Sequence, residues 1–392
     1  MCGRARRRSG PTCCWAVVWM MVHLTPPVRI PPRGLEVKNN YRVALIPGDG
    51  IGREVLSEGV KVMEAAARRF DFEFSWSEFD WSCERFHSVG EIMPADGLEQ
   101  LRNFDAIYFG AVGFPGVPDH VSLWNLLIPM RRGLKLYVNL RPVRLLPGMI
   151  SPLRDRIPGD IDYLIVRENN EGEYSEVGGR IYSGTDQEAA VQQSVFTKVG
   201  TDRIQRFAFE LAATRRNHLT SATKSNGIIH SMPYWDERFE ANGKDYSGVT
   251  TDQYHIDILS ARLVLSPDWF DVIVASNLFG DILSDLGPAT TGTIAIAPSA
   301  NLNPEREFPS LFEPVHGSAP DIAGKGIANP IGQIWSGVMM LDHLGQPAAG
   351  KAVMAAIEQL LASPDGIRTP DMGGKGLCRD VGESIAQIVA GA

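Results

Sequence analysis

The sequence predicts an α/β protein with a largely parallel sheet, and its length and composition are those of a globular protein large enough for two domains. Short runs of β-branched and aromatic residues alternate with longer segments of helical spacing. The chain has 392 residues, which is enough for two domains with substantial cores. Its 44% hydrophobic and 21% charged residues are typical of a soluble globular protein. The formal net charge of −8 argues against a nucleic-acid surface.

Residues 1–40 differ from the rest of the chain. Arg4 to Arg8 are mainly basic, Cys13 to Val22 are apolar, and several prolines follow. This order resembles a signal peptide, but no small-x-small cleavage site follows and the apolar run is too short to cross a bilayer. We expect residues 1–40 to be a disordered extension or the product of a start placed too far upstream, with order beginning near Tyr41. No other segment is apolar enough for a membrane span.

Cysteine usage points to a reducing compartment. The chain has 5 cysteines, and Cys2, Cys13 and Cys14 lie close to its start. They form neither a disulfide framework nor a zinc-ligand spacing. We therefore expect a cytoplasmic protein.

The secondary structure of the first half is read from short apolar runs and turn residues. The expected elements are a strand at Tyr41–Ile46, a glycine-rich turn at Pro47–Gly52, a helix at Arg53–Arg69, strands at Phe72–Phe79 and Phe104–Val112, and a proline-rich crossover between Arg141 and Asp160.

The second half continues the alternation. The expected elements are a strand at Ile161–Val166, an excursion of strands over Glu173–Phe196 with Gly178-Gly179 as its turn, helices at Asp202–Asn217, Met232–Ala241 and Asp252–Leu265, a strand at Phe270–Ala275, a helix over Asn277–Leu286, and helices at Ile331–Leu344 and Gly350–Leu361.

Asp281 and Asp285 are the strongest candidate metal ligands. Side chains four apart lie on one face of a helix, where two carboxylates repel each other unless a cation lies between them. Mg²⁺ or Mn²⁺ suits such oxygen ligands. A solvated helix face is the alternative, but the apolar neighbours Leu278, Phe279 and Ile282 favour a largely buried helix.

Arg131, Arg141 and Arg167 are candidate substrate ligands. Arg131 ends a helix-like stretch, and the other two are expected at strand ends, where α/β sheets bind ligands. Guanidinium groups bind carboxylates through paired hydrogen bonds. Three of them suit a small di-acid, although a single arginine at a strand end is more often a surface ion pair.

Tyr174, Lys224 and Asp257 are candidate polar groups of the same site. A lysine near a metal and arginines has its ammonium form disfavoured, so Lys224 can act as a base. A tyrosine can donate a proton to a developing carbanion. Asp257, with Ile256 and Ile258 beside it, could be a third carboxylate for the metal. A packed tyrosine, a solvated lysine and a helix-face acid are the alternatives.

The segment from Glu313 to Pro330 is a proline- and glycine-rich loop that opens a helix near Asn329. Such a loop can surround an adenosine, with His316 against the ring and Asp321 on the ribose hydroxyls. An acid at the ribose favours NAD, because it repels a 2′-phosphate. The G-x-G-x-x-G fingerprint is absent, and Gly48 to Gly52 gives only a weak G-x-G-x-G signal.

Together these segments resemble the β-decarboxylating dehydrogenase family, which holds the isocitrate, isopropylmalate, D-malate and tartrate enzymes. The resemblance extends from about Tyr41 to the C-terminus. It rests on the Asn277–Leu286 helix, the His316–Pro330 loop, an Asn139–Pro142 turn and the Arg167 and Tyr174 pair. It implies an isopropylmalate dehydrogenase-like two-domain fold with a large mixed sheet flanked by helices, not a Rossmann fold. Residues 41–136 and 295–392 would form a large cofactor-binding domain, and residues 137–294 a small substrate, metal and dimerisation domain.

The resemblance also implies a role for each candidate residue. Asp281 and Asp285 bind the divalent metal, while Asp257 and Lys224 reach the site from the other subunit of a homodimer. Lys224 takes the proton of the C2 hydroxyl, and Tyr174 delivers one to the carbon that loses CO₂. Arg131, Arg141 and Arg167 hold the substrate carboxylates, and NAD is bound by Glu313, His316, Gly317, Ser318, Ala319, Asp321 and Asn329. A monovalent-cation requirement stays open.

Trp124 and Ile128 indicate the substrate. The family reads the substituent at C3 with the helix before Arg131, and these bulky side chains leave room for little beyond hydrogen or hydroxyl. Trp124 resembles the tartrate and D-malate branch. We therefore expect NAD-dependent oxidation of D-malate or tartrate with metal-assisted β-decarboxylation, D-malate giving pyruvate and CO₂. Oxidation of isopropylmalate or isocitrate, and a non-catalytic regulatory subunit, are the alternatives.

Overall fold

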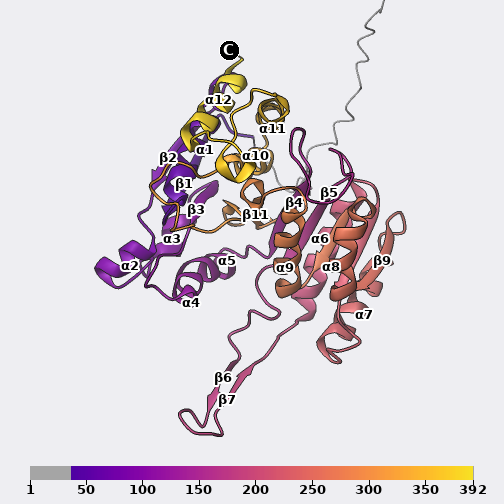
Figure 1. Cartoon of the computed structure of the whole chain (residues 1–392). Coiled ribbons are helices and arrows are strands. Elements are labelled where there is room, and N and C mark those ends of the chain that lie inside the picture. Colours follow the sequence, from indigo (N-terminus) through magenta and orange to yellow (C-terminus); the bar gives the residue numbers. More distant parts are fainter. Residues whose placement is uncertain (1–36, 392) are drawn as a thin grey trace, which may run out of the picture.

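A single sheet of ten strands runs through the computed structural model, which describes residues 37–391 (Figure 1). The strand order is β2 (Glu73–Glu78), β1 (Asn40–Gly48), β3 (Ala106–Ala111), β12 (Ser310–Pro314), β11 (Pro298–Leu302), β4 (Val138–Arg144), β5 (Asp162–Glu168), β10 (Val272–Ala275), β8 (His218–Thr223) and β9 (Thr250–His255). Neighbours are parallel except around β11 and β4, where the pairs β12–β11, β11–β4 and β4–β5 are antiparallel. The expected large mixed sheet is confirmed.

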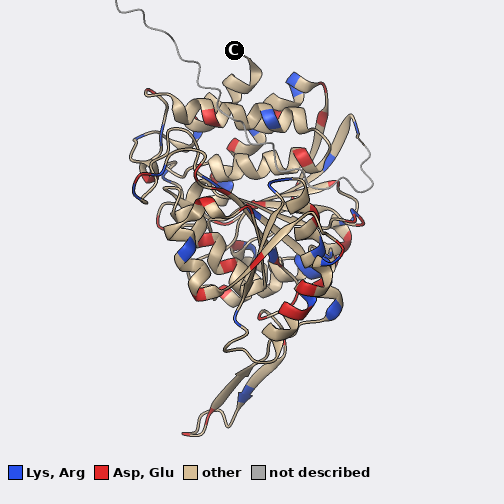
Figure 2. Ribbon diagram, turned by 90° about the vertical axis from the view of Figure 1, so that its right-hand side faces the viewer, with Lys and Arg blue, Asp and Glu red and all other residues tan. Residues whose placement is uncertain are grey.

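Helices flank the sheet in two groups (Figure 1). The helices are α1 (Gly52–Phe70), α2 (Cys83–Val89), α3 (Gly97–Leu101), α4 (Asp119–Ser122), α5 (Ile128–Gly133), α6 (Lys198–Ala213), α7 (Ser231–Gly243), α8 (Ile256–Leu265), α9 (Asn277–Ala289), α10 (Ile331–His343), α11 (Pro347–Ala362) and α12 (Cys378–Ala390). A π-helical turn, η1 (Leu123–Leu127), joins α4 to α5, and 3₁₀ turns lie at η2 (Pro267–Trp269), η3 (Ile294–Ile296) and η4 (Pro370–Met372). Figure 2 shows acidic and basic residues interspersed over these helices.

The core follows from the apolar periodicity of the elements. In α1, Val55, Val62 and Met63 recur on one face and are completely buried. The helix ends at Phe70, and the next residue, Asp71, adopts the left-handed conformation and donates its N–H to Ala67 O. β3 is buried along its whole length between helices on both faces, as expected for a central parallel strand.

The sheet draws its strands from both predicted domains. Strands β1, β2, β3, β11 and β12 come from residues 41–136 and 295–392, apart from Asn40 at the start of β1, and the other five come from residues 137–294. The two sets meet at the antiparallel β11–β4 pair, where Asn301 lies opposite Asn139. The division into two domains at these boundaries stays a prediction.

Several expected elements are wrong. The Asn139–Pro142 segment is not a turn but the middle of β4, because it pairs with β5 along its length. The expected helix at Asp252–Leu265 is two elements: residues up to His255 form β9 beside β8, and only the rest is α8. Leu278 and Ile282 are 38% and 49% exposed, so α9 is less buried than its apolar neighbours indicated.

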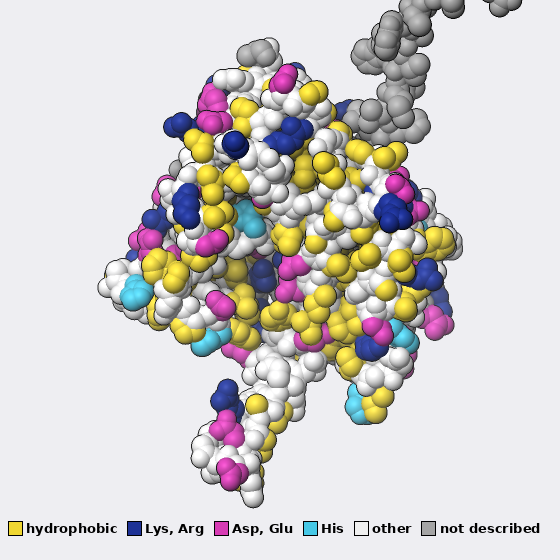
Figure 3. Space-filling model, in the orientation of Figure 1, with side chains coloured by type: hydrophobic (Ala, Val, Ile, Leu, Met, Phe, Trp, Pro, Cys, Tyr) yellow, Lys and Arg dark blue, Asp and Glu magenta, His cyan; other side chains and the backbone are white. Residues whose placement is uncertain are grey.

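An arm projects from the sheet (Figures 1 and 3). It consists of the hairpin β6 (Gly178–Ile181) and β7 (Ala189–Gln192), every residue of which is exposed. Gly178 and Gly179 lie within β6, opposite Gln192 and Val191, so the turn expected there is wrong. The chain reverses instead between the two strands, where Gly184 N donates to the Glu188 carboxylate at 2.7 Å.

The predictions for the N-terminal extension fall mostly outside the described residues, which begin at Val37. Within the described part, β1 starts at Asn40, and Lys38 pairs with Asp105 at 2.6 Å. Between residues 37 and 391, no helix is both long enough and apolar enough to cross a membrane.

Candidate active site

Arg141 and Arg167 project from the same face of the sheet toward α9. In the antiparallel β4–β5 pair, Arg167 lies opposite Asn139 and Arg141 opposite Ile165, so the two arginines are diagonal neighbours on one face. Arg167 donates through Nη1 to Asp281 Oδ1, and the Arg141 Nη1 atom lies 3.5 Å from the same oxygen. Both arginines are buried. α9 therefore presents Asp281 to two cations that the sheet fixes in place.

Tyr174 joins this cluster from the loop after β5. Its hydroxyl donates to Asp281 Oδ2 at 3.0 Å, and its ring lies 5.6 Å from the Arg167 guanidinium. Arg167 is in turn held by Asn277, whose side-chain oxygen accepts from Nε and Nη2 at 3.2 and 2.7 Å. A candidate proton donor thus lies directly against a candidate metal ligand.

Burial and neighbouring charges set the protonation of the cluster. Burial lowers the pKa of Arg167 to about 10, although the Asp281 charge opposes this. For Asp281, burial raises the pKa, but the charges of Arg167 and Arg141 outweigh it, so the pKa is lowered. Burial raises the pKa of Asp285, which is farther from those arginines, and burial followed by the Asp281 charge raises the pKa of Tyr174. At neutral pH the cluster holds an ionised Asp281 and a protonated Tyr174.

Arg131 is held by a buried polar network that sequence reasoning did not find. Its Nη2 atom lies 3.3 Å from Glu313 Oε1, and both side chains are about nine-tenths buried. The same carboxylate oxygen accepts from Asn301 Nδ2 at 2.8 Å, and Asn301 Oδ1 accepts from Asn139 and Asn169. Glu313 lies on β12 rather than in a loop, and its expected place beside the cofactor stays a prediction.

Lys224 and Asp257 form a separate pair. Lys224 follows β8, Asp257 is in the first turn of α8, and their Nζ and Oδ1 atoms are 2.9 Å apart. This hydrogen bond lowers the pKa of Asp257, and the Asp257 side chain is 66% exposed. Within residues 37–391 of one chain, no three acidic, histidine or cysteine side chains form a group that could hold a metal ion. One chain therefore does not bring Asp257 together with Asp281 and Asp285.

Asp281 and Asp285 still suit a divalent cation in part. Both carboxylates approach one atom, Arg141 Nη1, at 3.5 and 3.8 Å, so they face the same space. They are hard oxygen donors, as Mg²⁺ and Mn²⁺ require. The Asp285 side chain is 61% exposed, which leaves it open to further ligands.

The loop after β12 has features that suit an adenosine. His316 Nε2 is buried without a hydrogen-bond partner, and burial lowers the pKa of this histidine, so the ring is neutral. Asn329 Nδ2 donates to Asp371 Oδ2 at 3.0 Å. Asp371 also accepts from Thr369 and Thr293 and lies close enough to affect His316. Asp371 was missed by sequence reasoning because it lies far along the chain from the loop.

The remaining residues of this loop take different positions. Asp321 and Gly317 are exposed, and Ala319 has a positive φ of 39°. Ser318 is buried, and its carbonyl accepts from Ile51 N at 2.9 Å. A Cβ atom on Gly50 would lie only 2.1 Å from that carbonyl oxygen, so the glycine-rich turn packs directly on the loop. The glycine-rich turn therefore packs against the loop that forms the candidate cofactor site.

The candidate substrate pocket lies between α5 and the loop that carries Tyr174. Ile128 is buried and lines it, whereas Trp124 is half-buried on η1. The pocket is lined by Ile128, Arg131, Arg132, Asn169, Asn170, Tyr174 and Asn277 and has a volume of about 10 Å³. This is the space of about one water molecule, so the pocket is nearly filled by side chains.

The chain is similar in sequence and fold to several known proteins. Residues 42–385 match the family described as isocitrate/isopropylmalate dehydrogenase. The chain is 60% identical to D-malate dehydrogenase [decarboxylating] of Escherichia coli, over 89% of this chain and 98% of that protein. It is 56% identical to a tartrate dehydrogenase/decarboxylase of Pseudomonas putida, over 90% and 98% of the two chains. The crystal structure of isocitrate dehydrogenase from Methylococcus capsulatus superposes with a TM-score of 0.80 at 32% identity, over 89% and 99%. The chain therefore belongs to the isocitrate/isopropylmalate dehydrogenase family.

Proposed function

We propose that this protein oxidises D-malate or tartrate with NAD⁺ and decarboxylates the product, so that D-malate gives pyruvate and CO₂. The observation that carries the proposal is the buried cluster of Arg141 and Arg167 with Asp281 and Tyr174. Such a cluster can hold the carboxylates of a small di-acid beside a proton donor. Two relatives at 60% and 56% identity are named for these substrates, which supports this branch of the family.

The chain's own residues divide the work. Arg131, Arg141 and Arg167 bind and orient the carboxylates, since their guanidinium groups are buried and fixed. The Tyr174 hydroxyl supplies the proton to C3 after CO₂ leaves. Lys224 Nζ accepts the proton of the C2 hydroxyl. When bound, NAD⁺ supplies the hydride acceptor, and a divalent cation on Asp281 and Asp285 supplies a Lewis acid.

We place Lys224 and Asp257 at the active site of a second copy of the chain. In one chain these two residues pair with each other and not with Asp281. The arm and the residues at its base expose Val177, Ile181, Tyr182, Val191 and Val195. Because an isolated hairpin is barely stable in water, these side chains favour packing against a second copy of the chain. Neighbouring helices α8 and α9 expose Ile258, Leu265, Leu278 and Ile282. These apolar groups support a homodimer interface.

We propose NAD rather than NADP as the cofactor. Asp321 is exposed in the loop whose His316 Nε2 lacks a partner. A carboxylate there accepts hydrogen bonds from ribose hydroxyls and repels a 2′-phosphate. Gly317, Ser318 and Ala319 belong to the same loop, and we propose that their backbone groups contact the cofactor.

The substrate proposal is tested with a panel. Purified protein with Mn²⁺ is mixed with NAD⁺ or NADP⁺ and with D-malate, the tartrate isomers, 3-isopropylmalate or isocitrate, and both the reduced cofactor and pyruvate are measured. We expect NADH with D-malate and at least one tartrate, and pyruvate from D-malate. Turnover of isocitrate or 3-isopropylmalate without turnover of D-malate or tartrate would overturn the proposal.

A further inference from the structure

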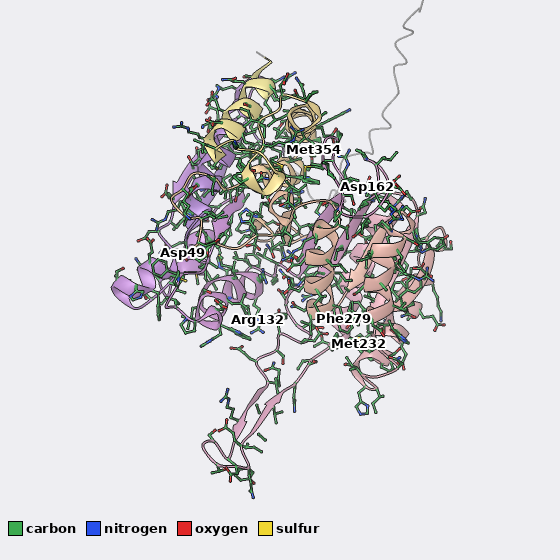
Figure 4. The ribbon with its side chains drawn as sticks, in the orientation of Figure 1. Asp49, Arg132, Asp162, Met232, Phe279 and Met354 are labelled. Carbon is green, nitrogen blue, oxygen red and sulfur yellow. The ribbon has the colours of Figure 1, made fainter. Side chains whose placement is uncertain are left out.

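Arg132 follows Arg131 on α5, but its side chain takes a different direction. Neighbouring residues on a helix are about 100° apart, so the two guanidinium groups reach different surroundings. Arg131 is buried against Glu313, whereas Arg132 is half-buried and faces the loop after β5. Figure 4 shows Arg132 beneath α5, near the base of the arm. The family resemblance gave Arg132 no role.

Three contacts hold the Arg132 guanidinium. Nη1 lies 2.7 Å from Glu176 Oε2, and Nη2 donates to the carbonyl oxygen of Tyr174 at 2.9 Å. The Arg132 Cζ atom lies 5.1 Å from the centre of the Trp124 ring, which is within the range of a cation–π contact. Arginine can make all three at once because its planar fork donates from its edge while its face stacks on a ring.

The π-helical turn explains why Trp124 and Arg132 meet. Residues eight apart on a continuous α-helix are about 80° out of line. A π turn includes one more residue per hydrogen-bonded ring, so it rotates less per residue and brings the two side chains toward one face. η1 spans Leu123–Leu127, so it includes Trp124 and the three residues after it, and α5 continues from there to Arg132. The local irregularity thus places the indole over the guanidinium.

Arg132 therefore links two parts of the candidate site. It lines the same narrow pocket as Ile128 and Tyr174. Its stacking fixes the Trp124 ring, and its bond to the Tyr174 carbonyl fixes the backbone that carries the candidate proton donor.

We propose that Arg132 is a positioning residue that sets substrate selection at C3, by holding Trp124 and the Tyr174 backbone against the site. The inference rests on the proposed function, since Trp124 selects at C3 only if malate-like acids bind there. Release of Trp124 enlarges the space beside C3, so 3-alkyl malates gain relative to D-malate. A misplaced Tyr174 lowers turnover of every substrate.

The test compares wild type with Arg132→Gln, Arg132→Lys and Glu176→Gln. The matched control is Arg102→Gln, because Arg102 also pairs with a carboxylate, Glu99 at 2.8 Å, and stacks on a ring, Phe308 at 4.6 Å, away from the site. For each protein, kcat and KM are measured with D-malate and with 3-methylmalate. Thermal midpoints identify any variant that is poorly folded, and crystal structures of wild type and Arg132→Gln locate the Trp124 ring.

For Arg132→Gln we expect kcat/KM with D-malate to fall about tenfold, or about 1.4 kcal/mol. The ratio of kcat/KM for 3-methylmalate over D-malate should rise about tenfold, as for one added methyl group in a pocket. Arg132→Lys keeps the charge but not the fork and should recover part of both effects. Glu176→Gln should shift the ratio less, in the same direction, and Arg102→Gln should leave it unchanged.

Two results would overturn the inference. One is an Arg132→Gln enzyme whose substrate ratio equals that of wild type and Arg102→Gln. The other is a Trp124 ring that keeps its wild-type position in the crystal structure of Arg132→Gln, a result that needs no turnover. Failure of the proposed function is recognised separately, because wild type would then not oxidise D-malate.

Discussion

Replacement of Glu313 by glutamine tests whether this carboxylate neutralises Arg131 or binds NAD. Glu313→Gln removes the charge beside Arg131 while keeping an amide oxygen that can accept from Asn301, as the carboxylate does at 2.8 Å. Both partners of the pair are about nine-tenths buried, so the interaction is not screened by solvent. Removing one partner of a buried ion pair costs about 3–5 kcal/mol. The 3.3 Å separation and the retained hydrogen bond to Asn301 favour the lower end, about 3 kcal/mol.

The expected change is measurable by thermal unfolding. An unfolding entropy of about 2.1 cal/mol/K per residue converts this loss into a fall of about 4 °C in the thermal midpoint for a chain of this size. Glu307→Gln is the control, because Glu307 pairs with Lys135 at 2.6 Å on the surface, where such a pair is worth about 1 kcal/mol or less. All proteins are compared at one concentration, since the stability of the proposed homodimer would depend on it.

Cofactor affinity decides between the two roles. If Glu313 acts on Arg131, the Kd for NAD from calorimetry should stay within about twofold of wild type, which is a change of less than 0.5 kcal/mol. If the variant kept the wild-type thermal midpoint and its Kd for NAD rose tenfold or more, Glu313 would not stabilise Arg131. It would then be a ligand of NAD.

Three further predictions concern the proposed active site and the buried carboxyl group of Glu168. Tyr174→Phe should lower kcat for D-malate by about 10²–10⁴-fold while KM changes little, as measured by pyruvate formation, because only the hydroxyl that we propose as the proton donor is lost. Co-expressed and separately tagged Lys224→Met and Tyr174→Phe chains should regain about one quarter of wild-type activity. If the proposed homodimer forms, half of the dimers are mixed and each of these has one intact site. Activity no greater than that of the two variants alone would contradict a shared site. Burial raises the pKa of Glu168 from 4.5 to about 7, so the folded protein binds a proton more tightly than the unfolded chain. The stability that this group contributes is present below pH 4.5 and decreases by about 3 kcal/mol as the pH rises to 7. In Glu168→Gln this decrease should be absent. Urea midpoints of wild type and variant at pH 5 and 8 measure the difference.

The elements that sequence predicted well are those whose pattern is local. β1 and β10 are short apolar runs between turn residues, and α9 has clear helical periodicity, so each is found within a few residues of its expected bounds. β9 was missed because Tyr254, four residues before Ile258, continues the helical spacing of α8. Only pairing with β8, more than thirty residues earlier, reveals the strand.

The residues of the candidate site also divide into those with a local sequence signal and those without one. Arg167 and Asp281 could be predicted because a strand end and a helix face carry recognisable polar residues. Arg141 lies in the middle of β4 and not at the end of a strand, so its expected position was wrong. Asn301 and Asp371 could not be predicted, because each acts through contacts with residues distant along the chain, Glu313 across the β11–β12 pair and Asn329 across a loop. A buried asparagine in a short strand has no spacing that distinguishes it from a turn residue.

The unbroken sheet has a mechanical consequence. Because β11 and β4 are joined by ladder hydrogen bonds at its centre, the two halves cannot swing apart about a slack connector without rupturing that ladder. Relative movement of the two halves would instead take the form of small changes of twist spread over several central strands. The stiffness of the β11–β4 pair would then limit how far the two halves of the sheet can move relative to each other.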